Sequence, residues 1–191
     1  RDSQMLQVGI TPTENTTIAG TYERSRAKVA YADRMMDGSK FDRDAWNIRF
    51  SQRSITPWFS ELELRYGQSE IDHVMDNYSL RTIRNPADKK ANNPKRNTDT
   101  GRLKATFDWD TVNLQTGIDY LDDVHVARME RGGDGYRHKP FMPNQSFKQW
   151  GMFAEAAWQR NENQKWVAGL RHDQVKAHYD TNRVTDPVLK H

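Results

Sequence analysis

Apolar and polar residues alternate along eight short segments of this chain. In one of them, Trp46, Ile48 and Phe50 are separated by single polar residues. Side chains of a β-strand point to opposite faces in turn, so a period of two predicts strands with one apolar and one polar face. The predicted strands cover residues 6–10, 17–23, 44–52, 60–69, 101–109, 111–122, 148–159 and 164–175.

The connections between these segments are short and long in turn. Short turns fall near residues 11–15, 54–57, 110 and 160–163, and long polar loops cover residues 27–42, 70–99 and 123–147. This asymmetry is typical of a transmembrane barrel with short periplasmic turns and long extracellular loops. A β-sandwich would explain the alternation but not the ordering of the loops. Aromatic residues gather near the short turns, as an interfacial girdle would: Trp58, Phe59, Phe107, Trp109, Trp158 and Trp166.

The pattern therefore predicts an all-β fold, an antiparallel transmembrane β-barrel section of eight strands in up-and-down hairpins. Only 35% of the 191 residues are hydrophobic and the mean hydropathy is −1.01, values that would also fit disorder. A barrel wall needs apolar residues at alternate strand positions only, so the low value agrees with it. There is no apolar run as long as a transmembrane helix. There is also no signal peptide, so we expect a mature chain or a piece of one.

The polar faces of the predicted strands carry many long charged side chains. A narrow eight-stranded barrel would have to pair all of them inside, whereas a wide barrel tolerates them more easily. Residues 187–191 do not have the pattern of a closing strand. We therefore expect a section of a larger barrel. A complete small barrel with an adhesion or structural role is the alternative.

Charge and motifs exclude several other functions. The net charge is +3, and the densest basic stretch, residues 89–96, lacks aromatic residues that could stack on bases. We interpret it as a solvated loop and expect no nucleic-acid partner. The chain has no cysteines, so neither a disulfide nor a thiolate metal site can form within it. The sequence has no nucleophile-elbow, P-loop or zinc-protease motif, so we expect neither an enzyme nor an organic cofactor.

The methionines are the unusual feature. Five of the seven fall in the predicted polar loops or at their roots, although methionine usually fills apolar interiors. Two of them share a local form, in residues 33–38 and 72–77, where Met36 and Met75 each precede an aspartate. Thioether sulfur suits Cu(I), and His73 would face the same side as Met75 in an extended segment. On spacing alone, however, loops that bind no metal remain the simpler interpretation.

These two segments carry a resemblance. Residues 31–41 and 72–81 resemble the TonB-dependent outer-membrane copper receptors, and residues 166–173 resemble a strand common to TonB-dependent receptors in general. The resemblance implies a barrel of roughly 22 strands with an N-terminal plug inside it. It implies copper import energised through TonB, and a methionine-rich site that barrel and plug residues complete together.

Carried over to this chain, the resemblance makes Met36 and Met75 metal ligands. Met35 is an adjacent alternative. His73 is a candidate auxiliary ligand because of its spacing from Met75, not because of the resemblance. The cargo would be a copper ion, as Cu(I). Residues 1–191 would form part of the barrel of a Gram-negative outer-membrane receptor, without its plug. Its partners would be the lipid bilayer and, through the plug, the TonB complex. A receptor for an iron–siderophore or another metal chelate is the nearest alternative.

Overall fold

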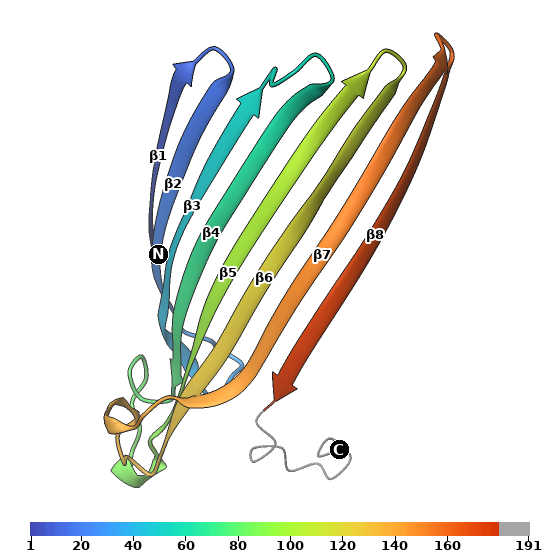
Figure 1. The fold of residues 1–191 in the computed structure, drawn as a ribbon. Coiled ribbons are helices and arrows are strands. Elements are labelled where there is room, and N and C mark those ends of the chain that lie inside the picture. The colour runs from blue at the N-terminus through green and yellow to red at the C-terminus, as the bar shows by residue number, and fades with distance from the viewer. Residues whose placement is uncertain (180–191) are drawn as a thin grey trace.

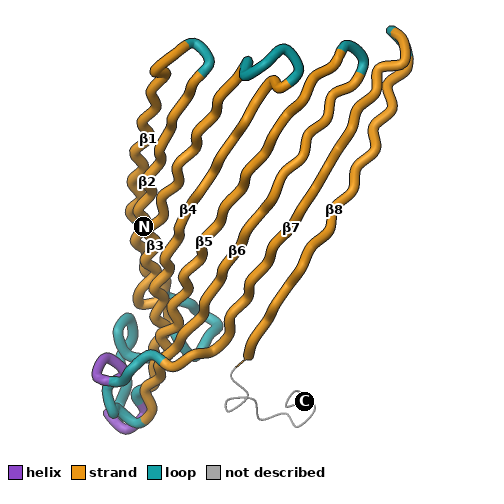
Figure 2. Tube along the Cα trace, viewed as in Figure 1, coloured by secondary structure: helices purple, strands orange, loops and turns teal. Residues whose placement is uncertain are grey.

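The protein forms one antiparallel sheet of eight strands, ordered β1 to β8 as in the sequence. The computed structural model describes residues 1–179 (Figure 1). The strands are β1 (Asp2–Thr13), β2 (Thr16–Val29), β3 (Asp37–Arg53), β4 (Phe59–Asp76), β5 (Lys90–Trp109), β6 (Val112–Arg131), β7 (Met142–Asn161) and β8 (Gln164–Tyr179). Two short 3-10 helices, η1 (Pro86–Asp88) and η2 (Tyr136–His138), lie in long connections (Figure 2). The predicted fold class is confirmed.

The sheet is a curved wall with two unlike ends. The short connections lie together at one end, and the three long ones, residues 30–36, 77–89 and 132–141, lie at the other (Figure 1). We call the second end the loop end. β1 and β8 stand at opposite edges of the sheet, so the described strands do not close into a small barrel. No second sheet covers the wall within residues 1–179, which excludes a sandwich for that part of the chain.

The strands extend further toward the loop end than the alternation predicted. β3 begins at Asp37 instead of residue 44, and β4 ends at Asp76 instead of residue 69. β5 to β7 are extended similarly, so most of the basic stretch at 89–96 is strand and not loop. Apolar and polar residues no longer alternate regularly there, so ladder hydrogen bonds continue where the hydrophobic period has ended. Residues 187–191, whose pattern did not fit a strand, lie outside the described residues.

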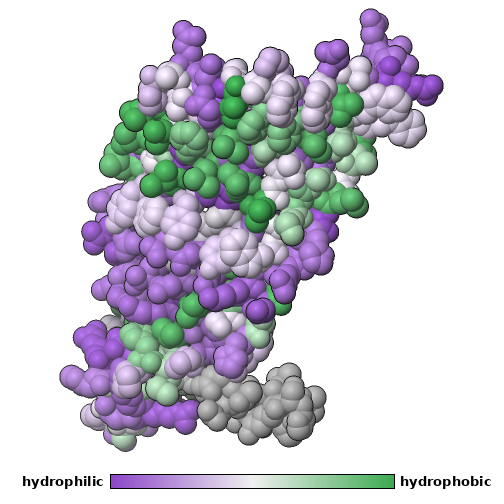
Figure 3. Space-filling model, in the orientation of Figure 1, coloured by the Kyte–Doolittle hydropathy of each residue, from purple (hydrophilic) through white to green (hydrophobic). Residues whose placement is uncertain are grey.

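One face of the wall carries an exposed apolar band. A single cross-strand row through five strands illustrates it: Phe50, Leu64, Leu103, Ile118 and Met152. The last four of these side chains are 41–58% exposed, so no other part of the described chain covers them. Figure 3 shows this band in green near the short turns, with a largely polar surface toward the loop end. Such a belt is what a lipid-facing wall requires.

Aromatic side chains border the band on both sides. Near the short turns the ring of Phe107 stacks against Phe59, Trp58 and Trp109 at centroid distances of 4.8, 6.0 and 6.0 Å. At the other border, three tyrosine hydroxyls each donate to an aspartate that lies two residues closer to the loop end: Tyr22 to Asp44, Tyr66 to Asp99, and Tyr120 to Asp122. Residues on the loop side of these tyrosines lie outside the apolar band.

The opposite face, called the polar face below, is a ladder of ion pairs. Glu63 is 2% exposed and accepts hydrogen bonds from Arg49 and Arg65. Asp119 accepts from Arg102 on the preceding strand and from Arg171 on β8. The charged faces expected from the sequence are therefore present, and their charges are paired across strands.

The few buried apolar residues gather at the loop end. Val74, Ala91 and Tyr136 form the cluster, and Tyr78 packs against it. Burial and a hydrogen bond donated to Glu130 raise the pKa of the Tyr78 phenol, which keeps it neutral. This small core joins the 77–89 and 132–141 connections to the strand ends. No helix in residues 1–179 is both long and apolar enough to span a membrane.

Candidate metal-binding site

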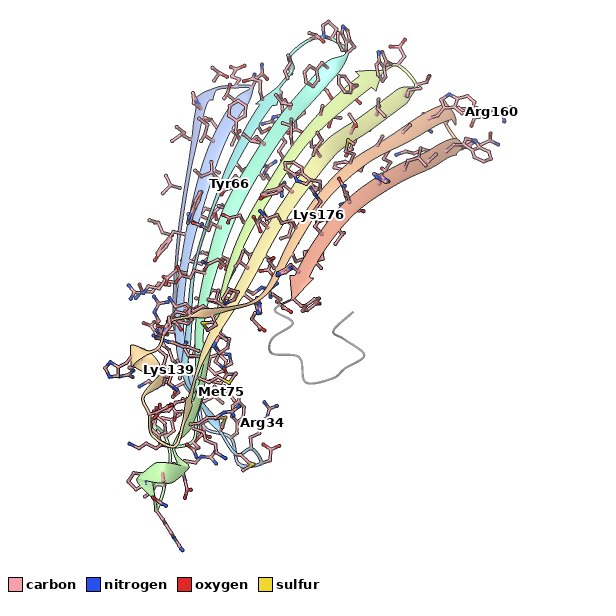
Figure 4. The ribbon with its side chains drawn as sticks, turned by 60° about the horizontal axis from the view of Figure 1, so that its bottom comes forward. Arg34, Tyr66, Met75, Lys139, Arg160 and Lys176 are labelled. Atoms are coloured by element: carbon pink, nitrogen blue, oxygen red, sulfur yellow. The ribbon has the colours of Figure 1, made fainter. Side chains whose placement is uncertain are left out.

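The two Met-Asp motifs lie side by side at the loop end. Met36 is the last residue before β3, which opens at Asp37, and β4 closes with Met75 and Asp76. In the ladder between these strands, Asp37 pairs with Asp76, and Gly38 pairs with Met75. Figure 4 shows Met75 at this end of the sheet. The pairing of β3 with β4 therefore brings the two motifs together.

Met75 belongs to the polar face. The pairing of β4 with β5 keeps one register from Glu61 to Asp76, so Met75 shares the face of Glu63 and Arg65. The same cross-strand row continues through Asn92 on β5 to Met129 on β6. Met75 and Met129 are therefore two strands apart, with Asn92 between them.

Met36 reaches the same row from the connection before β3. Its side chain lines a mainly apolar hollow together with Asn92 and Met129. The sequence placed Met75, Met129 and Met142 in loops or at their roots, but they lie in β4, β6 and β7. Met129 was not a candidate ligand, and only the register of β5 with β6 could have identified it.

His73 is the most informative residue of the site. It precedes Met75 by two positions and shares its face, as expected for an extended strand. Its imidazole stacks on the ring of Phe41 with centroids 4.0 Å apart. Nε2 is buried and has no hydrogen-bond partner among residues 1–179. Burial lowers the pKa of His73, although the charge of Asp72 opposes this shift. The lowered pKa favours the neutral imidazole, which is the form that binds metals.

Asn92 carries a second buried atom of this kind. Its Oδ1 has no partner in the described part of the chain. Buried polar atoms are normally hydrogen-bonded, so two unsatisfied ones next to Met75, one on its own strand and one on its β5 partner, indicate a place where a ligand can bind. The third such atom in the described residues, Asp122 Oδ1, lies away from this row. The donor set would be thioether sulfur, imidazole nitrogen and amide oxygen.

Met35 does not join this group. Its side chain is 84% exposed and lies outside the hollow that Met36 lines. The structure thus separates two adjacent methionines that the sequence could not tell apart. No cluster of three or more His, Cys, Asp or Glu side chains suited to a metal ion occurs within residues 1–179.

A curved meander wall with a lipid-facing belt and an ion-paired inner face defines an outer-membrane barrel section. Consistent with this, the family described as "TonB dependent receptor-like, beta-barrel" matches residues 2–190. The chain belongs to the TonB-dependent receptor family, which comprises transport proteins of the Gram-negative outer membrane and not enzymes.

Among solved structures, the chain is similar to one titled "Copper transporter OprC". The two are 30% identical with a TM-score of 0.86, and the match covers 93% of this chain and 29% of that one. This chain therefore spans less than a third of the length of that transporter. A comparison with curated proteins gives no match.

Proposed function

We propose that this chain is part of the barrel of a receptor that binds and imports copper. Met75 and His73 on β4 would supply a thioether and an imidazole from the wall. Met36 would supply a second thioether from the 30–36 connection. Met35 is excluded from this proposal because of its exposure and its position outside the hollow.

The observation that carries the proposal is the buried, unpartnered Nε2 of His73 beside Met75 on the polar face. Sulfur and imidazole donors together favour Cu(I) over hard ions such as Mg²⁺ or Ca²⁺. The similarity to a protein titled as a copper transporter supports the same cargo. The copper ion is thus the transported substrate.

Family membership supports two further parts of the proposal. The apolar band would contact the lipid bilayer, and import would draw energy from the inner membrane through TonB. The remaining ligands would come from parts of the receptor beyond this wall, because donors on one side only leave a metal open on the other.

The test is Cu(I) affinity of the intact receptor carrying Met75→Leu, Met36→Leu or His73→Ala, measured by competition with a Cu(I) chelator. Leucine keeps the volume of methionine but removes the sulfur. We expect each change to weaken Cu(I) binding by about tenfold or more. Met152→Leu is the matched control, because Met152 lies in the apolar band and should leave the affinity unchanged.

Unchanged affinity in all three variants would refute the site. Metal analysis of the purified wild-type receptor separates copper from the nearest alternative cargo. A receptor for an iron–siderophore should not retain copper in a stoichiometric amount, and that result would refute the copper proposal itself.

A further inference from the structure

The aspartates of the two Met-Asp motifs do not line the hollow that Met36 lines. Each of them instead holds one or both of the adjoining connections by hydrogen bonds. Asp37 is 1% exposed, and its two carboxylate oxygens accept both Nε and Nη2 of Arg81. Asp37 also accepts the backbone N–H of Tyr31 at 2.9 Å. The arginine comes from the 77–89 connection and the tyrosine from the 30–36 connection. One carboxylate therefore holds both connections.

Arg81 extends this fastening along the 30–36 connection. Its Nη1 donates to the carbonyl of Arg34 at 2.9 Å, and its Nη2 donates to the carbonyl of Tyr31 at 3.2 Å. These bonds bracket the stretch that leads to Met36. Because a guanidinium presents a rigid fork of donors, it fixes several acceptors at once.

Asp76 plays the corresponding part for the second connection. It is 2% exposed and accepts the backbone N–H groups of Tyr78 at 3.1 Å and Ser79 at 2.7 Å. It also accepts the hydroxyls of Ser39 at 2.5 Å and Ser79 at 2.7 Å. The start of the connection that carries Arg81 is thus tied to the end of β4 and to β3.

From these contacts we propose that Arg81, held against Asp37, is a positioning residue for the metal ligands. The proposal rests on the copper-binding function above. In each motif the methionine is the ligand and the aspartate is the anchor of the adjoining backbone. Arg81 couples the two anchored connections, so that Met36 is held over the row of Met75 and Asn92 before metal arrives.

Preorganisation is the physical reason. When a segment becomes ordered only as the ligand binds, the loss of conformational entropy lowers the affinity. Groups that orient metal ligands without touching the metal typically change metal affinity by about 10- to 100-fold when removed. We expect the lower part of that range here, since Met75 and His73 sit on a strand and need no clamp.

The experiment uses the full-length receptor with Arg81→Gln and Arg81→Lys. We expect Arg81→Gln to weaken Cu(I) binding about tenfold, and Arg81→Lys, which keeps the charge but loses the fork, to weaken it less. In the absence of copper, hydrogen–deuterium exchange of peptides covering residues 30–36 should be faster than in wild type, and the increase should be larger in Arg81→Gln than in Arg81→Lys. A fold-wide loss of stability would instead raise exchange throughout the strands.

Arg26→Gln is the matched control. Arg26 also pairs with a carboxylate, that of Asp44, and donates to two backbone carbonyls, those of Ser25 and Arg43. Its side chain is 29% exposed, against 33% for Arg81. It anchors no part of the 30–36 connection, so exchange there and Cu(I) affinity should both match wild type.

Wild-type Cu(I) affinity in Arg81→Gln, or equal losses in Arg81→Gln and Arg26→Gln, would overturn the positioning role while leaving the copper site intact. Unchanged exchange of residues 30–36 in Arg81→Gln would overturn it as well. Failure of the wild-type receptor to bind Cu(I) would refute both this role and the proposed function. The two failures are distinguishable, because only the second affects the unmodified protein.

Discussion

The imidazole of His73 lies against the ring of Phe41, with the two centroids 4.0 Å apart and 27° between the planes. The two residues are direct partners in the β3–β4 ladder. The Phe41 ring also lies over Gly38, where an added Cβ would collide with it. The ladder shifts register between Gly38 and Lys40, which gives the chain the extra residue of a bulge. Gly38, Phe41 and His73 are therefore one packing unit.

The first prediction follows from this unit. Gly38→Ala should push the Phe41 ring off the imidazole and misplace Nε2, lowering the Cu(I) affinity of the intact receptor about tenfold. Gly20→Ala is the control, because a Cβ there would meet only ordinary contacts, the nearest heavy atom being 3.8 Å away. Chelator competition measures both variants. Equal affinities would show that Phe41 does not position the imidazole.

The second prediction concerns acid. The hydrogen bonds from Arg81, and then that from the Tyr31 amide, lower the pKa of Asp37 from 3.8 to about 2. The pKa of Asp37 is lower in the folded state than in the unfolded state. The contacts of Asp37 with Arg81 and Tyr31 therefore contribute fully to stability above pH 3.8, and this contribution is lost as the pH falls toward about 2. Pepsin, active in this window, should cut residues 30–36 of the receptor increasingly as the pH falls.

Asp37→Asn is the comparison for that titration. The amide has no charge to lose, so the cleavage rate of the variant, relative to an unstructured substrate, should already exceed that of wild type at a pH of about 4. It should then stay constant down to a pH of about 2, where the wild-type rate approaches it. A wild-type profile that runs parallel to that of the variant would contradict the assignment of the acid transition to Asp37.

The third prediction tests the aromatic border near the short turns. Phe107 contacts Phe59, Trp58 and Trp109, and offset aromatic pairs add about 0.5–1.5 kcal/mol each beyond the area they bury. Phe107→Ala should therefore lower the free energy of unfolding of the receptor from lipid vesicles by about 2 kcal/mol. Thr17→Ala on β2, which touches none of these rings, is the control. Equal stabilities would show that the Phe107 ring does not stabilise this end of the wall.

The apolar band could be predicted from the sequence because it lies where only one face of each strand is polar. The spacing of Trp46, Ile48 and Phe50 alone predicts a strand at this position of β3. The same strand from Asp37 to Arg43 escaped detection, because polar side chains occupy both of its faces there. Its pairing with β4 comes from backbone hydrogen bonds and cross-strand ion pairs such as Lys40 with Asp72, which follow no hydrophobic period.

The candidate site was predictable only where a local sequence pattern marks its residues. Met36 and Met75 stood out because each precedes an aspartate in a predicted polar loop. Met129 and Asn92 did not, since their relevance comes from a register that spans β4 to β6. The role of Arg81 depends on a bend in the 77–89 connection that returns it to Asp37, and no local sequence pattern specifies such a contact.

The fourth prediction concerns the ion-pair ladder of the polar face. Glu63 has a side chain that is 3% exposed and lies between Arg49 and Arg65 at 2.6 and 2.9 Å. Glu63→Gln keeps the shape but leaves two guanidinium groups facing each other without an anion. Removing one partner from a buried charge cluster typically costs about 3–5 kcal/mol; since both arginines are about half exposed, we expect roughly 2 kcal/mol here.

Urea unfolding of the receptor from lipid vesicles measures that loss, with Glu155→Gln as the control. Glu155 lies on the same face and is exposed, so its substitution should change the free energy of unfolding by less than about 0.5 kcal/mol. High salt should reduce the difference between Glu63→Gln and wild type, since exposed guanidinium groups are screened. A loss that is independent of salt, or equal in the two variants, would show that packing and not charge holds this part of the wall.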